Sequence, residues 1–431
     1  MIDWLGNVLV ALTVVGCAAM LTVVVSFFFQ VRTFLALRSG AIAEERQRLE
    51  RPLPPDEALP HVVVQLPTYN EGAIVERAIA NAVRLDWPKD KLHVQVCDDS
   101  TDGTTAIAQA AAQQARDAGF DVVVLHRGDR TDFKAGALRN AMAQTEHGYF
   151  AILDVDYVSS PDFLRQCMTV LLGEPKLAFV QARLDFLNAN ENLLTRAQTI
   201  MLDFHYGLEQ PLRSWSGQVV PFNGTCGIWR RDAIEAGDGW HGDTVTEDWD
   251  LSYRAWLNGW RGIYVTSVTL SGELPTRWRI WKAQQRRWAS GIGQVALKMS
   301  PAVIRERGLT ATERLGGLLP LALWVGYLMF AVTLIFAVAA ALLKPAIALP
   351  FGLGVYAVYL VAWTALLVVM LVAMRSVGRK TPLWRYFLDF QVVPYLILYI
   401  CWENLRSVPA TLLGRQRSFV RTPKRGSLAA P

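Results

Sequence analysis

The stretch LHVQVCDDSTDGT, Leu92–Thr104, decides the fold class of this chain. Its first six residues predict a strand that ends at two adjacent acids, Asp98 and Asp99. The Ser, Thr and Asp residues that follow suit the start of a helix, and the alanine-rich stretch Thr104–Ala118 continues with helical composition. Helix capping accounts for these hydroxyl residues but does not require two acids at the end of a strand. The stretch therefore predicts one strand–helix unit of an α/β fold, with polar groups at the turn.

The same unit recurs on both sides of this stretch. Short apolar runs predict three further strands, and two segments with helical spacing lie between them: strands His61–Leu66, Val122–Leu125 and Tyr149–Leu153, and helices Glu71–Arg84 and Lys134–Gln144. Alternating strands and helices predict a doubly wound, mostly parallel sheet. Ligands of such sheets bind beyond the carboxyl ends of the strands. Three of the four expected strands end directly in polar motifs, so we expect a site at this edge.

Apolar residues are concentrated at the two ends of the chain. Hydrophobic residues make up 52% of the 431 residues and charged residues 19%, and the excess lies in Asn7–Phe29 and Leu315–Met374. No charge occurs from Leu5 to Gln30, which is long enough to cross a hydrocarbon core of about 30 Å. A cleaved signal peptide is disfavoured because no basic residue precedes this run. Leu315–Leu343 and Phe351–Met374 predict two further spans.

Basic residues predict the orientation of these spans. Arg32, Arg38, Arg46 and Arg48 follow the first span and nothing basic precedes it, so the middle of the chain is expected in the cytosol, beneath the inner (cell) membrane. The net charge of +5 suits anionic lipid headgroups better than nucleic acid. Phe387–Trp402 is apolar but short, and we expect it to lie in the interface or to form a hairpin with Val408–Leu413.

Cysteine and histidine give no sign of a metal centre. The five cysteines are scattered without paired or metal-type spacing, which is typical of buried thiols in a reducing compartment. The six histidines do not cluster in the sequence either, so we expect no zinc site.

Four motifs carry possible chemistry. Asp154-Val155-Asp156 follows a strand, and its carboxylates are suited to share Mg²⁺ or Mn²⁺ with a diphosphate. Lys134 begins a helix after a turn, where a phosphate is favoured. In Thr246-Glu247-Asp248 one carboxylate, preferably Asp248, is suited to act as general base. Gln284-Gln285-Arg286-Arg287-Trp288 lies in a helix rich in basic and aromatic residues, which is also typical of a membrane interface.

Taken together, the motifs resemble those of the processive inverting family-2 glycosyltransferases of the cellulose-synthase superfamily. The resemblance is closest to the cellulose-synthase-like A and C proteins, the mannan and glucan synthases. It is carried by PTYNE at Pro67–Glu71, DDSTDGT at Asp98–Thr104, KAGAL at Lys134–Leu138, DVD, VQAR at Val180–Arg183, FNGT at Phe222–Thr225, TED and QxxRW. In the tail, Phe419–Lys424 is similar to the family's gating loop.

The resemblance implies a sheet of the nucleotide-diphospho-sugar transferase (GT-A) type and a role for each matched residue. Asp248, with Glu247, would be catalytic, and Asp154 and Asp156 would hold the metal. The donor nucleotide would contact Thr68, Asn70, Glu71, Asp98, Asp99, Lys134, Asp154, Arg287, Thr422 and Lys424. The acceptor would contact Phe222, Asn223, Gly224, Thr225, Gln284 and Trp288. The family often has a histidine after the Asp-x-Asp pair, where this chain has Tyr157.

These expectations divide the chain into six parts. They are a transmembrane helix (1–31), a linker (32–60), a cytosolic transferase domain (61–275), interface helices (276–312), transmembrane or re-entrant helices (313–413) and a basic tail (414–431). The expected function is polymerisation of a β-linked polysaccharide from UDP-glucose or GDP-mannose. The alternative is transfer of one or a few sugars to a ceramide or diacylglycerol lipid. A scaffold with a decayed transferase domain is disfavoured because all the acids are present.

Overall fold

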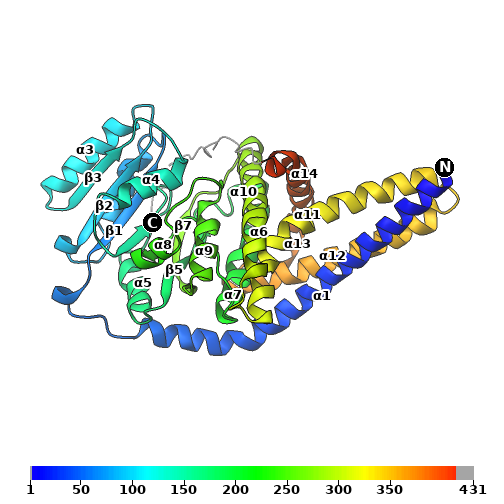
Figure 1. The fold of residues 1–431 in the computed structure, drawn as a ribbon, viewed down its shortest axis with the longest axis horizontal. Helices are drawn as coiled ribbons and strands as arrows, with labels where there is room; N and C mark the ends of the chain where they lie inside the picture. Colours follow the sequence, from blue (N-terminus) through cyan, green and yellow to red (C-terminus); the bar gives the residue numbers. More distant parts are fainter. Residues whose placement is uncertain (1, 414–431) are drawn as a thin grey trace.

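A seven-stranded mixed sheet forms the centre of the computed structural model, which describes residues 2–413 (Figure 1). The strand order is β3-β2-β1-β4-β6-β5-β7, and β6 runs antiparallel to both of its neighbours. The strands are β1 (Val62–Thr68), β2 (Leu92–Asp98), β3 (Asp121–His126), β4 (Tyr149–Ile152), β5 (Leu177–Phe186), β6 (Gly227–Arg230) and β7 (Arg261–Gly272). The four strands expected from the sequence are present, and the doubly wound mixed sheet is confirmed.

Helices cover both faces of the sheet. Along β1, Val62, Val64 and Leu66 belong to the apolar core on one face, whereas Val63 belongs to the core on the other. This alternation follows from the two-residue period of a strand and requires cover on both sides. One face is covered by α2 (Ile74–Ala82), α3 (Thr104–Asp117) and α5 (Phe163–Leu172), and the other by α4 (Phe133–Met142), α8 (Arg231–Ala236) and α9 (Glu247–Leu257).

A further group of helices lies beyond the β7 side of the sheet (Figure 1). They are α6 (Leu193–Phe204), a π-helical turn (His205–Glu209), α7 (Gln210–Trp215), α10 (Trp278–Arg305), α13 (Leu383–Phe390) and α14 (Val393–Leu412). Two short 3₁₀ turns, Asp56–Ala58 and Lys89–Lys91, lie in connections. Trp281 of α10 packs with Phe390 and Leu396 in one apolar core. Of the two alternatives expected for Phe387–Trp402, the hairpin with Val408–Leu413 is wrong, because α14 is continuous through Leu412.

Three long apolar helices project together from the sheet, with the N-terminal end at their tip (Figure 1). They are α1 (Ile2–Leu49), α11 (Ala311–Leu343) and α12 (Ala348–Ser376). Among the described residues, α1 and α12 are long and apolar enough to cross a membrane by length and composition. Helix α1 continues to Leu49, so the expected linker begins only after that residue.

Buried ion pairs and hydrogen bonds fix the apolar helices to the sheet domain. Glu45 of α1 accepts hydrogen bonds from the main-chain N–H and the hydroxyl of both Thr266 and Ser267 in β7, at 2.7–3.1 Å. After α12, Arg379 donates to Asp203 at 2.7 and 2.9 Å and to Asp185 at 2.6 Å. The two parts therefore form one packed unit.

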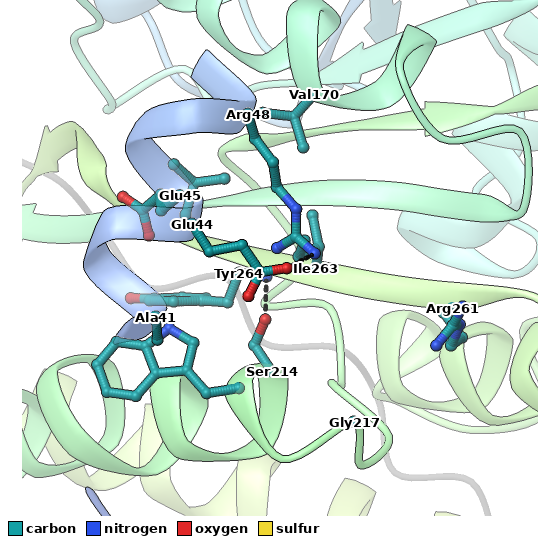
Figure 2. Close-up of a pocket in the computed structure, with 12 residues that line it drawn as sticks. Ala41, Glu44, Glu45, Arg48, Val170, Ser214, Gly217, Arg261, Ile263 and Tyr264 are labelled. Atoms are coloured by element: carbon teal, nitrogen blue, oxygen red, sulfur yellow. Dashed lines mark hydrogen bonds and ion pairs between the residues drawn. The ribbon is translucent and has the colours of Figure 1, made fainter. Parts of the chain in front are cut away.

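A pocket lies where α1 crosses β7 (Figure 2). Glu44, Glu45 and Arg48 line it from the helix, and Ile263 and Tyr264 line it from the strand. None of the residues expected to bind donor or acceptor lines this pocket. We attribute it to the junction between helix and sheet.

Candidate functional site

The carboxyl ends of β1, β2 and β4 bring the polar motifs together at one edge of the sheet. Thr68 of β1 and Asp98 of β2 are paired in register, and the Asp99 N–H donates to the Thr68 carbonyl at 3.0 Å. Strand β4 lies beside β1 and ends two residues before Asp154. The common edge expected from the sequence is therefore present.

The two acids after β2 are engaged within the protein. The fully buried Asp98 accepts from the Ser100 N–H at 3.0 Å and from the Thr105 hydroxyl at 2.6 Å. Burial alone would raise its pKa, but these hydrogen bonds and one with His126 hold the pKa below its ordinary value. Asp99 accepts two hydrogen bonds from the Arg127 guanidinium, at 2.6 and 2.7 Å. Both carboxylates therefore stabilise the loop after β2, at the carboxyl edge of the sheet.

The loop after β1 is tied to the loop after β2. Asn70 has a left-handed backbone (φ 54°), and its side-chain oxygen accepts from the Thr101 N–H at 2.8 Å. The Asn70 N–H donates to the Ser100 hydroxyl at 2.9 Å, while the Thr68 hydroxyl donates back to the Leu66 carbonyl. Glu71 lies in the same turn and is partly exposed. Thr68, Asn70 and Glu71 therefore form one side of the edge.

Lys134 links the motifs. It lies in the first turn of α4, after a tight turn in which Asp132 and Phe133 both have positive φ. Its Nζ donates to Asp154 Oδ1 at 2.6 Å and to the Gly224 carbonyl at 2.8 Å. One ammonium thus connects the Asp-x-Asp loop with the FNGT loop, which the sequence alone did not predict.

The FNGT loop is hydrogen-bonded to the Asp-x-Asp loop through the main chain of Asp154. The Asp154 N–H donates to the Thr225 hydroxyl at 2.8 Å. The Asp154 side chain is 36% exposed, so a ligand can reach it, whereas Asp156 is buried. Carboxylate oxygens are the ligands that Mg²⁺ and Mn²⁺ prefer. These two acids therefore fit such an ion if phosphate and water oxygens complete its shell.

The FNGT loop, Phe222–Thr225, is positioned by two glutamines to which the sequence assigned no role. The Gln181 side chain accepts from the Asn223 N–H at 2.9 Å and donates to the Thr225 and Cys226 carbonyls at 3.0 Å. Gln210 donates to the Asn223 side-chain oxygen at 2.8 Å. Gln181 belongs to the VQAR stretch. A glutamine between apolar residues was the sequence feature that could have indicated its role in holding another loop.

Glu247 and Asp248 begin α9 opposite this loop. Gly224 has φ 76°, and a Cβ atom placed there would lie 3.0 Å from Asp248 Oδ2. Burial and the adjacent Glu247 raise the pKa of Asp248 to about 7. Burial also raises the pKa of Glu247, although Lys134 opposes that rise. A carboxylate with a pKa near neutrality is suited to accept a proton at physiological pH.

Helix α10 brings a second cation to the same place. Gly291 packs so closely on Thr246 that a Cβ would overlap its side chain, and the Val245 N–H donates to Gln294 at 3.0 Å. Arg287 lies one turn before Gly291. Burial lowers the Arg287 pKa, and the charges of Glu247, Asp154 and Asp248 oppose this. The same acids raise the pKa of Lys134 against the effect of burial.

Two expected acceptor residues, Gln284 and Trp288, lie on α10 beside Arg287 and are partly buried. The structure therefore brings the Asp-x-Asp loop, Lys134, the FNGT loop, the Glu247–Asp248 pair and Arg287 into one electrostatic cluster. The expected lid residues Thr422 and Lys424 lie outside the described residues.

Comparison with known proteins identifies relatives of this chain. Residues 149–377 match the profile of the family described as "Glycosyl transferase family group 2". The chain is 38% identical over 263 residues to "Probable glucomannan 4-beta-mannosyltransferase 10" of Arabidopsis thaliana, covering 60% of this chain and 48% of that protein. It is 33% identical over 399 residues to "Glucomannan 4-beta-mannosyltransferase 2" of the same plant, covering 89% and 72%. The chain thus spans about half of the first relative and most of the second.

A solved structure shares the fold. It is described as "Mannosyltransferase PcManGT from Pyrobaculum calidifontis in complex with GDP-Man and Mn2+", and it superposes with a TM-score of 0.59 at 21% identity, covering 86% of this chain and all of that one. This likeness supports the GT-A type of sheet expected from the sequence.

Proposed function

This chain belongs to glycosyl transferase family group 2, and from that premise we propose that it transfers mannose from GDP-mannose to a β-linked glycan at a membrane. Hexosyl transfer is the activity of the family relatives, while the donor, the linkage and the polymer are the proposal. The names of the glucomannan 4-beta-mannosyltransferases support mannose as the sugar. The similar solved structure holds GDP-Man, which is compatible with GDP as the nucleotide of the donor proposed here. UDP-glucose is the competing donor.

The observation that carries the proposal is the convergence on Lys134. This side chain bonds to Asp154 of the expected donor motif and to Gly224 of the expected acceptor motif. Gly224 in turn lies against Asp248 Oδ2. A diphosphate near Lys134 and a sugar hydroxyl near Gly224 would therefore be adjacent, as a displacement reaction requires.

In the proposed reaction Asp248 removes the proton from the acceptor hydroxyl. The hydroxyl oxygen forms a bond to the anomeric carbon as the bond from that carbon to the diphosphate oxygen breaks. The proton stays on Asp248, and the configuration at the anomeric carbon inverts. The raised pKa of Asp248 favours this transfer because the carboxylate and its protonated form are both accessible near neutral pH.

Lys134 and Arg287 face the negative charge that develops on the leaving diphosphate. Both are held among carboxylates in a partly buried setting, where electrostatic stabilisation is stronger than in water. Asp154 and Asp156 would hold Mg²⁺ or Mn²⁺, which when bound neutralises phosphate oxygens. We expect activity to be lost in excess EDTA and restored by Mn²⁺, and full activity in EDTA would contradict the metal assignment.

The remaining assignments are proposals of the same kind. Thr68, Asn70, Glu71, Asp98 and Asp99 would border the nucleotide. Phe222, Asn223, Thr225, Gln284 and Trp288 would border the acceptor, and Thr422 and Lys424 would close over the donor.

We further propose that the transferase domain faces the cytosol, because the basic part of α1 follows its apolar part. The test is the exposed residue Asp90, replaced by cysteine in a chain whose five native cysteines are all buried. An impermeant thiol reagent should label Asp90→Cys only after the cells are permeabilised. Labelling of intact cells would refute the orientation.

The decisive experiment measures nucleotide release by the purified protein with GDP-mannose or UDP-glucose, in parallel with Asp248→Asn. The expected result is GDP release that requires a manno-oligosaccharide acceptor, gives a product cleaved by β-mannanase and disappears in the variant. Sugar transfer to ceramide or diacylglycerol, with no oligosaccharide product, would instead establish the lipid glycosyltransferase alternative.

A further inference from the structure

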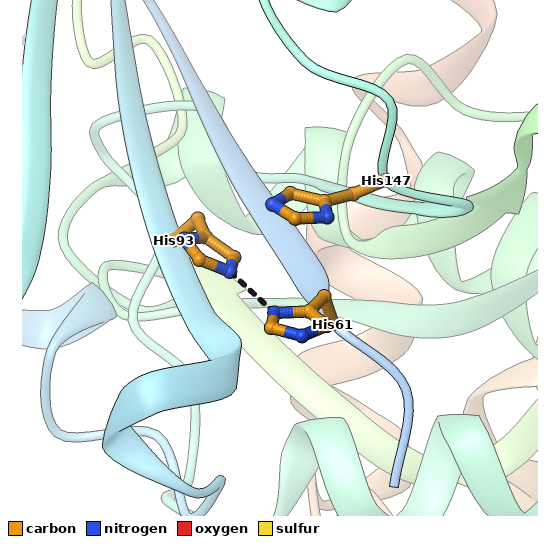
Figure 3. A group of neighbouring side chains, drawn as sticks. All are labelled: His61, His93 and His147. Atoms are coloured by element: carbon orange, nitrogen blue, oxygen red, sulfur yellow. Dashed lines mark hydrogen bonds between the residues drawn. The ribbon is translucent and has the colours of Figure 1, made fainter.

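Three histidines meet at the opposite edge of the sheet from the candidate active site (Figure 3). His61 directly precedes β1, His93 is the second residue of β2, and His147 lies two residues before β4. These are the amino ends of three adjacent parallel strands in the order β2-β1-β4. The histidines are scattered in the sequence, but the strand order brings these three together in space.

The three imidazole rings lie in contact with one another. Their centroids are 4.2 Å apart for His93–His147, 4.7 Å for His61–His147 and 5.1 Å for His61–His93. One ring nitrogen from each residue lies within 4.8 Å of the corresponding atoms of the other two. His61 is exposed and the other two are partly buried, so the group is open to solvent on one side.

A carboxylate supports this cluster from the next strand. Asp121, the first residue of β3, lies with Oδ2 at 2.6 Å from His93 Nδ1. A carboxylate at this distance holds the proton on Nδ1 and leaves the lone pair on Nε2. That Nε2 accepts a hydrogen bond from His61 Nδ1 at 2.8 Å, inside the cluster, and a metal ion would replace this shared proton. Metal-binding histidines commonly have such a carboxylate on the nitrogen that does not bind the metal.

We propose that His61, His93 and His147 bind one zinc-type divalent transition-metal ion, with Asp121 orienting His93. Imidazole nitrogen favours Zn²⁺, Co²⁺, Ni²⁺ and Cu²⁺, whereas Mg²⁺ and Mn²⁺ favour oxygen. The site is thus chemically different from the Asp154–Asp156 pair. Three protein ligands leave a fourth tetrahedral position for water or another ligand. The bound ion joins the amino ends of three central strands, so it should stabilise the sheet whatever the transferred sugar.

A second group of possible ligands provides an internal contrast. His241, Asp243 and Asp250 also lie within reach of one another. Here, however, Lys298 pairs with both acids at 2.7 and 2.8 Å, and Arg254 pairs with Asp250 at 2.7 Å. Because cations already neutralise these carboxylates, His241 serves as a control.

The test uses the full-length protein in detergent, without a polyhistidine tag and stripped of metal. Co²⁺ is titrated and its visible absorption recorded, and then Zn²⁺ is added in competition. We expect one equivalent of Co²⁺ to give the bands of a tetrahedral site, Zn²⁺ to abolish them, and excess Mg²⁺ to leave them unchanged. Zn²⁺ should also raise the unfolding temperature.

Variants identify the ligands. His93→Gln and His61→Gln should abolish the tetrahedral cobalt spectrum, and the exposure of His61 makes its replacement safe for folding. Asp121→Asn should retain the site but weaken metal affinity about 10–100-fold. His241→Gln should bind as the wild type does. The proposal is overturned if His61→Gln binds Zn²⁺ as tightly as the wild type, or if His241→Gln alone loses the ion.

Discussion

Replacing Asp248 with asparagine is expected to stabilise the folded protein above neutral pH while removing its transferase activity. Burial, and then the Glu247 carboxylate, raise the pKa of Asp248 from 3.8 to about 7. Between these values the folded protein keeps a proton that the unfolded chain has released. The resulting stabilisation is complete below the lower value and is lost as the pH rises through the higher one. An asparagine side chain at this position carries no charge, so the variant does not lose stability in this way.

The magnitude follows from the difference between the two pKa values. Each unit corresponds to about 1.4 kcal/mol, so the cost of ionising Asp248 in the folded protein approaches about 4 kcal/mol at roughly pH 8. The attraction of Lys134 is already contained in the pKa of about 7, but solvent screens this partly exposed side chain and reduces the cost. We therefore expect a net gain of about 2 kcal/mol, or a rise in Tm of about 4–8 °C for a domain of this size.

The assay is thermal unfolding followed by tryptophan fluorescence at several values between about pH 5 and pH 8. The gain in Tm should be smallest at the acid end, where the folded protein keeps the Asp248 proton and the unfolded chain has only begun to release it, and should grow until the pH passes about 7. Asp238→Asn is the control, because Asp238 is exposed and its left-handed backbone (φ 66°) suits asparagine. A gain that is absent at pH 8, or equal at both ends, would refute the reasoning. Nucleotide release, measured in parallel, should fall about 10²–10⁴-fold.

Three other substitutions test the packing around the site and the attachment of the apolar helices to the sheet domain. Gly224→Ala should lower kcat and destabilise the protein by about 1 kcal/mol or more, because it combines positive φ with a close approach to Asp248; an unchanged kcat would contradict the placement of this loop. Gly291→Val should separate α10 from Thr246 and lower both activity and Tm, whereas Gly352→Ala, in open space on α12, should change neither. Arg379→Gln should cost about 3–5 kcal/mol because it leaves Asp203 buried without its cation. Arg385→Gln, at a more exposed and longer pair, should cost under about 1 kcal/mol, and equal losses in Tm would show that burial is not the cause.

Local patterns predicted the first half of the sheet and the edge that carries the motifs. Strand, polar loop and helix follow one another directly at Leu92–Asp117, so short-range hydrophobic and capping signals suffice there. The contacts of Gln181 and Gln210 with the FNGT loop could not be predicted in this way. They depend on how β5 and α7 pack against a distant loop, which no local pattern encodes.

The polar half of α1 and the histidine cluster were missed for different reasons. Residues 32–49 were expected to belong to the linker 32–60, yet they continue the helix, which tolerates polar residues where one side docks, as Glu45 does on β7. The histidines lie on separate strands, and only the order β2-β1-β4 makes them neighbours. Strand order arises from long-range pairing, so spacing in the sequence gave no indication of it.

The continuity of α1 has a consequence for the height and rotation of the sheet domain above a bilayer. Its 48 residues span about 72 Å at 1.5 Å each, more than twice a hydrocarbon core of about 30 Å. One residue inserted between the apolar half and Glu45 would turn the docking face by about 100°, away from Thr266 and Ser267. Seven inserted residues, close to two full turns, would restore that phase but lengthen the helix by about 10 Å. The length of this helix would therefore set the distance of the site from the lipid, and its helical phase would set the direction in which the site faces.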